Sequence, residues 1–160
     1  MNLASIGSIS HGTLRTEDLL DTFASELEYH IQRNAAAWLG EGAANRDRLL
    51  ALVAEANEID SDSDDASELV DSLSDALQEF APAYCYFGSL EGDGSDFGFW
   101  PSRDAIEELP RISDDATDDD GEPIGFADQA RALGEDCTFV NDHGNVTVYG
   151  GDGSILLELV

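Results

Sequence analysis

The stretch of residues 60–80 constrains the fold most strongly, because a burst of aspartates runs directly into an amphipathic helical pattern. Its apolar residues recur at three- and four-residue steps, which places them on one face of a helix. Carboxylates recur on the opposite face, and the stretch contains no lysine or arginine. We therefore predict a helix with one buried and one negatively charged side. The predicted buried side consists of Leu69, Val70, Leu73, Ala76, Leu77 and Phe80.

The charged side of this helix has two interpretations. Its carboxylates follow one another about a helical turn apart, so they form a line along the helix. The line is either a solvated face or a working surface that imitates the phosphates of DNA. Its members are Asp64, Glu68, Asp71, Asp75 and Glu79.

The charge of the whole chain bears on this choice. The sequence has 35 aspartates and glutamates, seven arginines and no lysine, for a formal net charge of -28. Self-repulsion of this size disfavours a compact state. Duplex DNA carries one charge per about 1.7 Å of its axis, so this charge equals that of about 48 Å of duplex. A 160-residue globule is expected to be about 40 Å across, a comparable charge density. The same acidity argues against direct binding to nucleic acid or an anionic membrane.

Residue patterns predict an α+β fold in one domain, residues 1–160. Residues 1–12 resemble a flexible or edge segment, and 13–81 are predicted to be helical. Pro82 ends this part, and residues 83–160 are predicted to be mainly β. We expect three N-terminal helices packed on an antiparallel sheet of about four or five strands, with one short extra helix from Arg103 to Leu109.

Two further acidic clusters fall in predicted loops. Residues 91–96 lie in the turn of an expected hairpin, and residues 113–123 form an acidic loop that we expect to be mobile. A helix holds its carboxylates more rigidly than a loop does, so the helical line is expected to contribute most to binding. The secondary candidates are Asp93, Asp96, Asp118, Asp119 and Asp120.

Motifs for catalysis are scarce. His11, His30 and His143 lack the spacing of a metal triad, and there is no phosphate-binding loop, nucleophile elbow or dinucleotide fingerprint. We therefore expect no enzymatic activity and no cofactor. Cys85 and Cys137 lie far apart without metal-ligand spacing, which fits reduced core residues.

A partial calcium-loop pattern begins at Asp60. Asp60, Asp62 and Asp64 alternate like the first three ligands of an EF-hand, and Asp71 occupies the twelfth position. The sixth position requires glycine but is Asp65, and the twelfth is aspartate where a bidentate glutamate is usual. A calcium-binding module is therefore a minor alternative.

The expected location is cytoplasmic. No apolar run approaches the ~18 residues of a membrane span, and the N-terminal residues have neither a basic region nor a long apolar one.

Three segments carry a resemblance to known proteins: SISHGTLRTEDLL, YFGSLEGDGSDFGFWPS and FVNDHGNVTVYG. They resemble segments of short, mostly uncharacterised acidic proteins carried by bacterial phages and plasmids. In composition the chain is also similar to phage and plasmid antirestriction proteins and to acidic anti-CRISPR inhibitors. The resemblance implies that the protein originates from a mobile element and acts in a bacterial host cell, and it supplies no catalytic motif.

The leading hypothesis is a non-enzymatic DNA-mimic inhibitor. It would bind the cationic nucleic-acid groove of a host defence complex, either a CRISPR effector or a restriction-modification enzyme, and block access of DNA. The alternative is an accessory interaction domain whose acidity serves solubility or adaptation to salt. The target and the oligomeric state stay open at this point.

Overall fold

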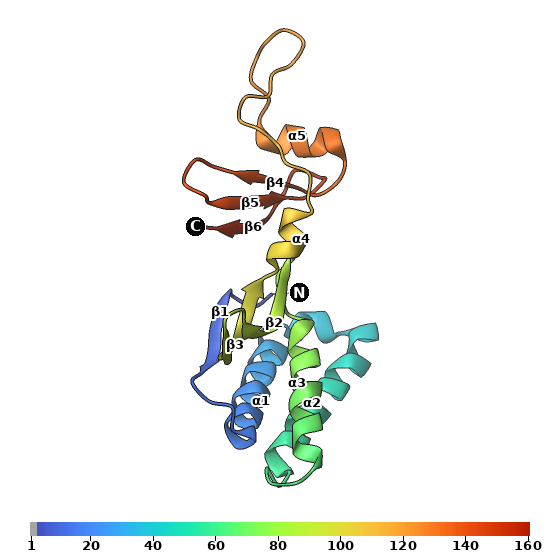
Figure 1. The fold of residues 1–160 in the computed structure, drawn as a ribbon. Coiled ribbons are helices and arrows are strands. Elements are labelled where there is room, and N and C mark those ends of the chain that lie inside the picture. The colour runs from blue at the N-terminus through green and yellow to red at the C-terminus, as the bar shows by residue number, and fades with distance from the viewer. Residues whose placement is uncertain (1–2) are drawn as a thin grey trace. The chain divides into compact units, whose positions relative to one another are not determined.

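The computed structural model describes residues 3–160, and the chain divides into two compact units, Met1–Pro101 and Ser102–Val160 (Figure 1). The division falls after the first hairpin, whereas the sequence indicates a change of structure near Pro82. The expectation of a single domain over residues 1–160 stays a prediction. Each unit is described separately below.

The first unit combines helices with a three-stranded antiparallel sheet. Helices α1, α2 and α3 pack together, and the strand order of the sheet is β1-β3-β2 (Figure 1). Two short 3-10 helices, η1 and η2, connect α1 to α2. The elements are β1 (Gly7–His11), α1 (Thr16–Arg33), η1 (Ala35–Trp38), η2 (Gly40–Gly42), α2 (Ala43–Glu58), α3 (Asp65–Gln78), β2 (Cys85–Leu90) and β3 (Asp93–Pro101).

The core of this unit lies between the helices and the sheet. Leu73 and Leu77 of α3 are fully buried, as the helical periodicity predicts. The ring of Phe23 on α1 meets the ring of Phe87 on β2 at 5.0 Å between centroids, and Phe87 lies 5.0 Å from Phe99 on β3. The predicted buried side of α3 is therefore confirmed, with Val70 only partly buried.

The second unit is smaller and has its own core. Its antiparallel sheet has the order β4-β5-β6, and Ala130 of α5 and Cys137 of β4 are fully buried. The rings of Phe126 and Phe139 stack at 4.1 Å beside them. The elements are α4 (Arg103–Glu107), α5 (Phe126–Leu133), β4 (Cys137–Val140), β5 (Val146–Tyr149) and β6 (Ile155–Leu159).

The α+β class and the three packed N-terminal helices are confirmed, but the prediction of one sheet with four or five strands is wrong. The strands form two separate three-stranded sheets, because each strand pairs only with strands of its own unit among the described residues. Strand β1 comes from residues expected to be a flexible or edge segment and lies at the edge of the first sheet. The expected short extra helix corresponds to α4, whereas α5 was not predicted.

No helix within residues 3–160 is long and apolar enough to cross a membrane.

Strand β1 approaches β3 so closely that one position on β3 requires glycine. Gly98 pairs with Ser8, and a Cβ atom on Gly98 would collide with the carbonyl oxygen of Gly7 and lie 2.9 Å from the Cα of Ser8. Both obstacles are backbone atoms, so a side-chain rotation cannot relieve the clash.

We therefore expect Gly98→Ala to lower the free energy of unfolding by about 1–3 kcal/mol, the usual cost of overpacking. Urea unfolding followed by tryptophan fluorescence measures this change. Gly94→Ala is the matched control on the same strand, because no atom lies within 4 Å of its added Cβ. Equal stability of the two variants would contradict the close β1–β3 contact.

Candidate functional site: the acidic face of α3

The charged side of α3 faces solvent along the helix. Asp64 precedes the helix and Glu68, Asp71 and Asp75 follow on it, and all four residues are exposed. Steps of three or four residues separate the Cα atoms of successive carboxylate residues by about 4.5–6 Å along the axis. None of the ion pairs found among the described residues involves any of these four carboxylates. We call these four residues the α3 acidic face.

Glu79, the fifth predicted member, has a different environment. Arg48 of α2 forms an ion pair with it, and the Nδ2 group of Asn45 donates a hydrogen bond to it at 2.9 Å. These contacts neutralise the Glu79 carboxylate and tie α2 to the C-terminal end of α3. The unpaired line of charge therefore ends at Asp75.

Asp93, the first residue of β3, takes part in a local hydrogen-bond pattern with Ser95. The Asp93 carboxylate accepts the backbone N–H of Ser95 at 3.1 Å and its hydroxyl at 2.8 Å. These two bonds lower the pKa of Asp93, and the charge of His11 adds a smaller effect in the same direction. Asp93 is half-buried, so part of its carboxylate still reaches solvent.

Asp96 does not suit the surface role expected for it. Its exposed fraction is only 9%, and its side chain lies 3.6 Å from Nδ1 of His11. His11 belongs to β1 and sits opposite Asp96 in the strand ladder. Strand β1 covers Asp96, and recognising this burial requires knowing that β1 pairs with β3.

The acidic loop 113–123 contains several local hydrogen bonds, and its expected mobility stays a prediction. The Asp118 carboxylate accepts the backbone N–H groups of Asp120 at 3.0 Å and Glu122 at 2.9 Å. The backbone N–H of Gly121 donates to the Asp118 carbonyl at 3.0 Å. The loop therefore forms a tight turn around Asp118, with Asp120 exposed at its tip.

Gln129 of α5 fastens both ends of this loop. Its amide nitrogen donates to the carbonyl oxygens of Ser113 at 2.7 Å and Ile124 at 2.9 Å, and its amide oxygen accepts the N–H of Ser113 at 3.2 Å. Asp119 is exposed at the tip. These carboxylates belong to the second unit, whereas the α3 acidic face belongs to the first.

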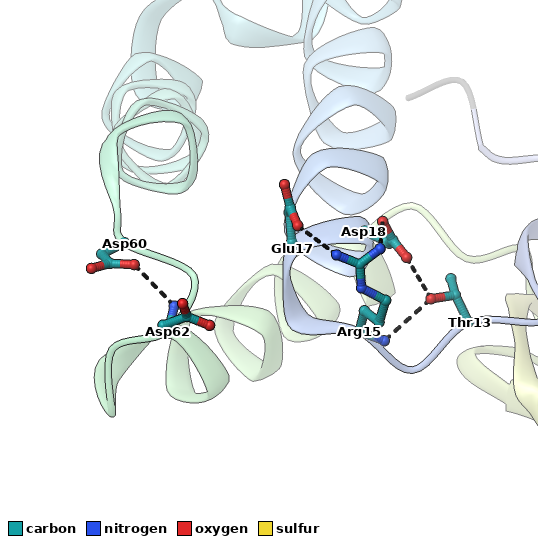
Figure 2. A network of polar contacts seen from close by, with 6 residues as sticks. All are labelled: Thr13, Arg15, Glu17, Asp18, Asp60 and Asp62. Carbon is teal, nitrogen blue, oxygen red and sulfur yellow. Dashed lines mark hydrogen bonds and ion pairs between the residues drawn. The ribbon is translucent and has the colours of Figure 1, made fainter.

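The calcium-loop pattern lacks converging ligands. Asp60 accepts the backbone N–H of Asp62 at 3.1 Å within the link between α2 and α3 (Figure 2). Across residues 3–160, no group of three or more histidine, cysteine, aspartate or glutamate side chains is arranged to hold a metal ion. Asp60, Asp62 and Asp64 are exposed in this link.

The aromatic residues of the first hairpin divide between the two faces of the sheet. Phe99 is buried and Phe97 packs against the core. Tyr86 and Trp100 are paired across the strands and are half-buried. The Trp100 indole donates to the Gly88 carbonyl at 3.0 Å, so this ring is tied to its own sheet. Tyr84, just before β2, is also half-buried.

Sequence patterns did not reveal a groove of about 310 Å³ that lies beside the α3 acidic face. Leu14, Val70 and Phe97 line it together with Asp71, one of the four exposed carboxylates. We call it the α1–α3 groove. Leu14 gave no useful indication of this groove in the sequence, because single apolar residues are common on protein surfaces.

Searches with protein-family models, among curated proteins and among solved structures found no match to this chain.

The hydrogen bonds of Ser95 lead to a prediction about pH. Because the pKa of Asp93 is lowered, the bonds contribute stability above the ordinary aspartate pKa of about 3.8, and this contribution is lost as the pH falls through the lowered value. Ser95→Ala should raise the pKa of Asp93 toward the ordinary value, and NMR titration of the carboxyl carbons measures it. The matched control is Ser154→Ala, which should shift Asp152 instead. An unchanged Asp93 pKa in Ser95→Ala would contradict the assigned cause.

Proposed function

We propose that the protein is a non-enzymatic DNA mimic that inhibits a host defence complex. In this proposal the α3 acidic face binds the cationic nucleic-acid groove of a CRISPR effector or a restriction-modification enzyme and keeps DNA out. The observation that carries the proposal is the row of four exposed carboxylates on one helix, without a cationic partner in the part of the chain that the structure describes. A resemblance to acidic phage and plasmid proteins is consistent with it.

Rigid display of charge supports binding by this helix. The apolar side of α3 is buried in the core, so the carboxylates are held in position before a partner arrives, and less entropy is lost on binding. Each carboxylate can accept charge-assisted hydrogen bonds from arginine or lysine. The net charge of -28 would also accelerate encounter with a cationic groove.

The proposed contact residues are fewer than the sequence indicates. Asp64, Glu68, Asp71 and Asp75 are the principal phosphate surrogates, and Glu79 contributes less because Arg48 neutralises it. Asp96 is removed from the set because it is buried. The secondary candidates that remain are Asp93, Asp118, Asp119 and Asp120.

One observation favours the alternative of an acidic interaction domain without mimicry. Exposed carboxylates also lie on other helices, such as Glu55 and Glu58 on α2, where their side chains likewise form no ion pair among the described residues. If acidity serves only solubility, these residues and the α3 acidic face should be equivalent. This equivalence makes them the natural control for the proposed site.

We expect the charge reversal Asp71→Arg with Asp75→Arg to weaken binding to the target at least about tenfold and to reduce the salt dependence of the affinity by about two charges. The target is first captured from a bacterial lysate on the immobilised protein. Competition with duplex DNA is then measured at several salt concentrations.

The matched control is Glu55→Arg with Glu58→Arg, which changes the net charge equally on the exposed side of α2. Retained binding of this control together with loss in the α3 variant supports mimicry by α3. Equal weakening of both variants would indicate general acidity, and full binding by the α3 variant would exclude α3 as the mimic.

A further inference from the structure

We infer that the α1–α3 groove is the second half of the docking surface and receives an apolar side chain from a basic segment of the partner protein. The charged half of this surface rests on the function proposed above, whereas the apolar half rests on the groove itself. The partner segment would place a leucine-like side chain in the groove and an adjacent arginine or lysine on Asp71.

The groove is lined by apolar side chains that pack against the core and by the carboxylate of Asp71. Val70 of α3 and Phe97 of β3 are partly buried and pack against the main core, and Asp71, which follows Val70 on α3, also lines the groove. The volume of about 310 Å³ lies at the lower end of the ~300–1,000 Å³ typical of ligand pockets. This size suits one or two side chains better than a large cofactor.

Leu14 forms the exposed rim of the groove and is held in place by its neighbours. Its exposed fraction is 66%, which is large for a leucine. The Thr13 hydroxyl donates to the Asp18 carboxylate at 2.6 Å and accepts the backbone N–H of Arg15 at 3.2 Å (Figure 2). These bonds fix the chain on both sides of Leu14, so little ordering is needed when a partner covers it.

The charge around the groove selects a basic occupant. Among the described residues, the groove is lined by Asp71 but by no arginine or histidine. Arg15, next to Leu14 in sequence, is occupied by Glu17 at 2.9 Å and by Asp18 at 3.9 Å (Figure 2). An acidic apolar segment or an anionic lipid would be repelled here, so charge complementarity favours an apolar side chain flanked by cations.

In this arrangement the partner's affinity for the protein has a contribution from the α3 acidic face and a contribution from the α1–α3 groove. Contacts to the α3 acidic face should weaken with salt, as phosphate contacts do. The contact in the groove should depend little on salt, because burial of apolar area is not an ion-pairing effect. DNA has no equivalent of the apolar contact in the groove. The groove would therefore add to the partner's affinity for the mimic a contribution that does not depend on charge.

The test uses the full-length protein and two fluorescent peptides of equal length and charge, one of alternating arginine and leucine and one of alternating arginine and serine. Dissociation constants are measured by anisotropy at several salt concentrations. We expect the leucine peptide to bind about tenfold more tightly at every salt concentration. Leu14→Ser should abolish this preference and leave the salt dependence unchanged.

Two variants complete the design. Asp71→Asn should reduce the salt dependence by about one charge for both peptides. Leu39→Ser removes another leucine of the same unit, which is 77% exposed and lines a different pocket, and it should change neither the leucine preference nor the salt dependence. Thermal unfolding checks that each variant keeps its fold.

The outcomes distinguish the two proposals. Equal affinity for both peptides, a leucine preference that survives Leu14→Ser, or an equal loss in Leu39→Ser would overturn the groove. A leucine preference that depends on Leu14, combined with salt dependence unaffected by Asp71→Asn, supports the groove and counts against the charged role of the α3 acidic face.

Discussion

Burial of the apolar side of α3 is the interaction on which the first unit depends. Leu73, Leu77 and Phe80 are fully buried, and the helical period then turns Asp71 and Asp75 outward. A rotation of the helix that hid these carboxylates would bury charge without a partner, which is far costlier than exposing a few methyl groups. The core and the acidic face are therefore two consequences of one constraint.

The C-terminal end of α3 is anchored by polar contacts as well as by apolar packing. Phe80 stacks on the buried ring of His30 at 4.8 Å, and Nε2 of His30 lies 3.0 Å from the Glu26 carboxylate one turn earlier on α1. At the same end, Arg48 of α2 pairs with Glu79. Both neighbouring helices thus hold α3, which fixes its acidic face as a rigid surface.

Arg15, Arg48 and Arg131 each stabilise local structure or join two segments of the chain. Arg15 pairs with acids at the start of α1, and Arg131 of α5 bonds Asp128 at 2.6 Å and the carbonyl oxygen of Asp152 at 3.0 Å. Cations used in this way stabilise local structure. Acidic residues far outnumber arginines in the chain, so we expect the electrostatic interactions of its surface to weaken with salt.

The sequence by itself determined the amphipathic α3, the end of the helical part near Pro82 and the aromatic hairpin, because periodicity and turn residues act over a few neighbouring positions. Only the tertiary structure decided that β1 covers Asp96, that Gln129 fastens the acidic loop, and that Leu14 borders a groove beside Asp71. These features join segments that lie far apart in the chain. Strand pairing and side-chain packing between such segments produce no periodic pattern in the local sequence, so the sequence alone does not predict them.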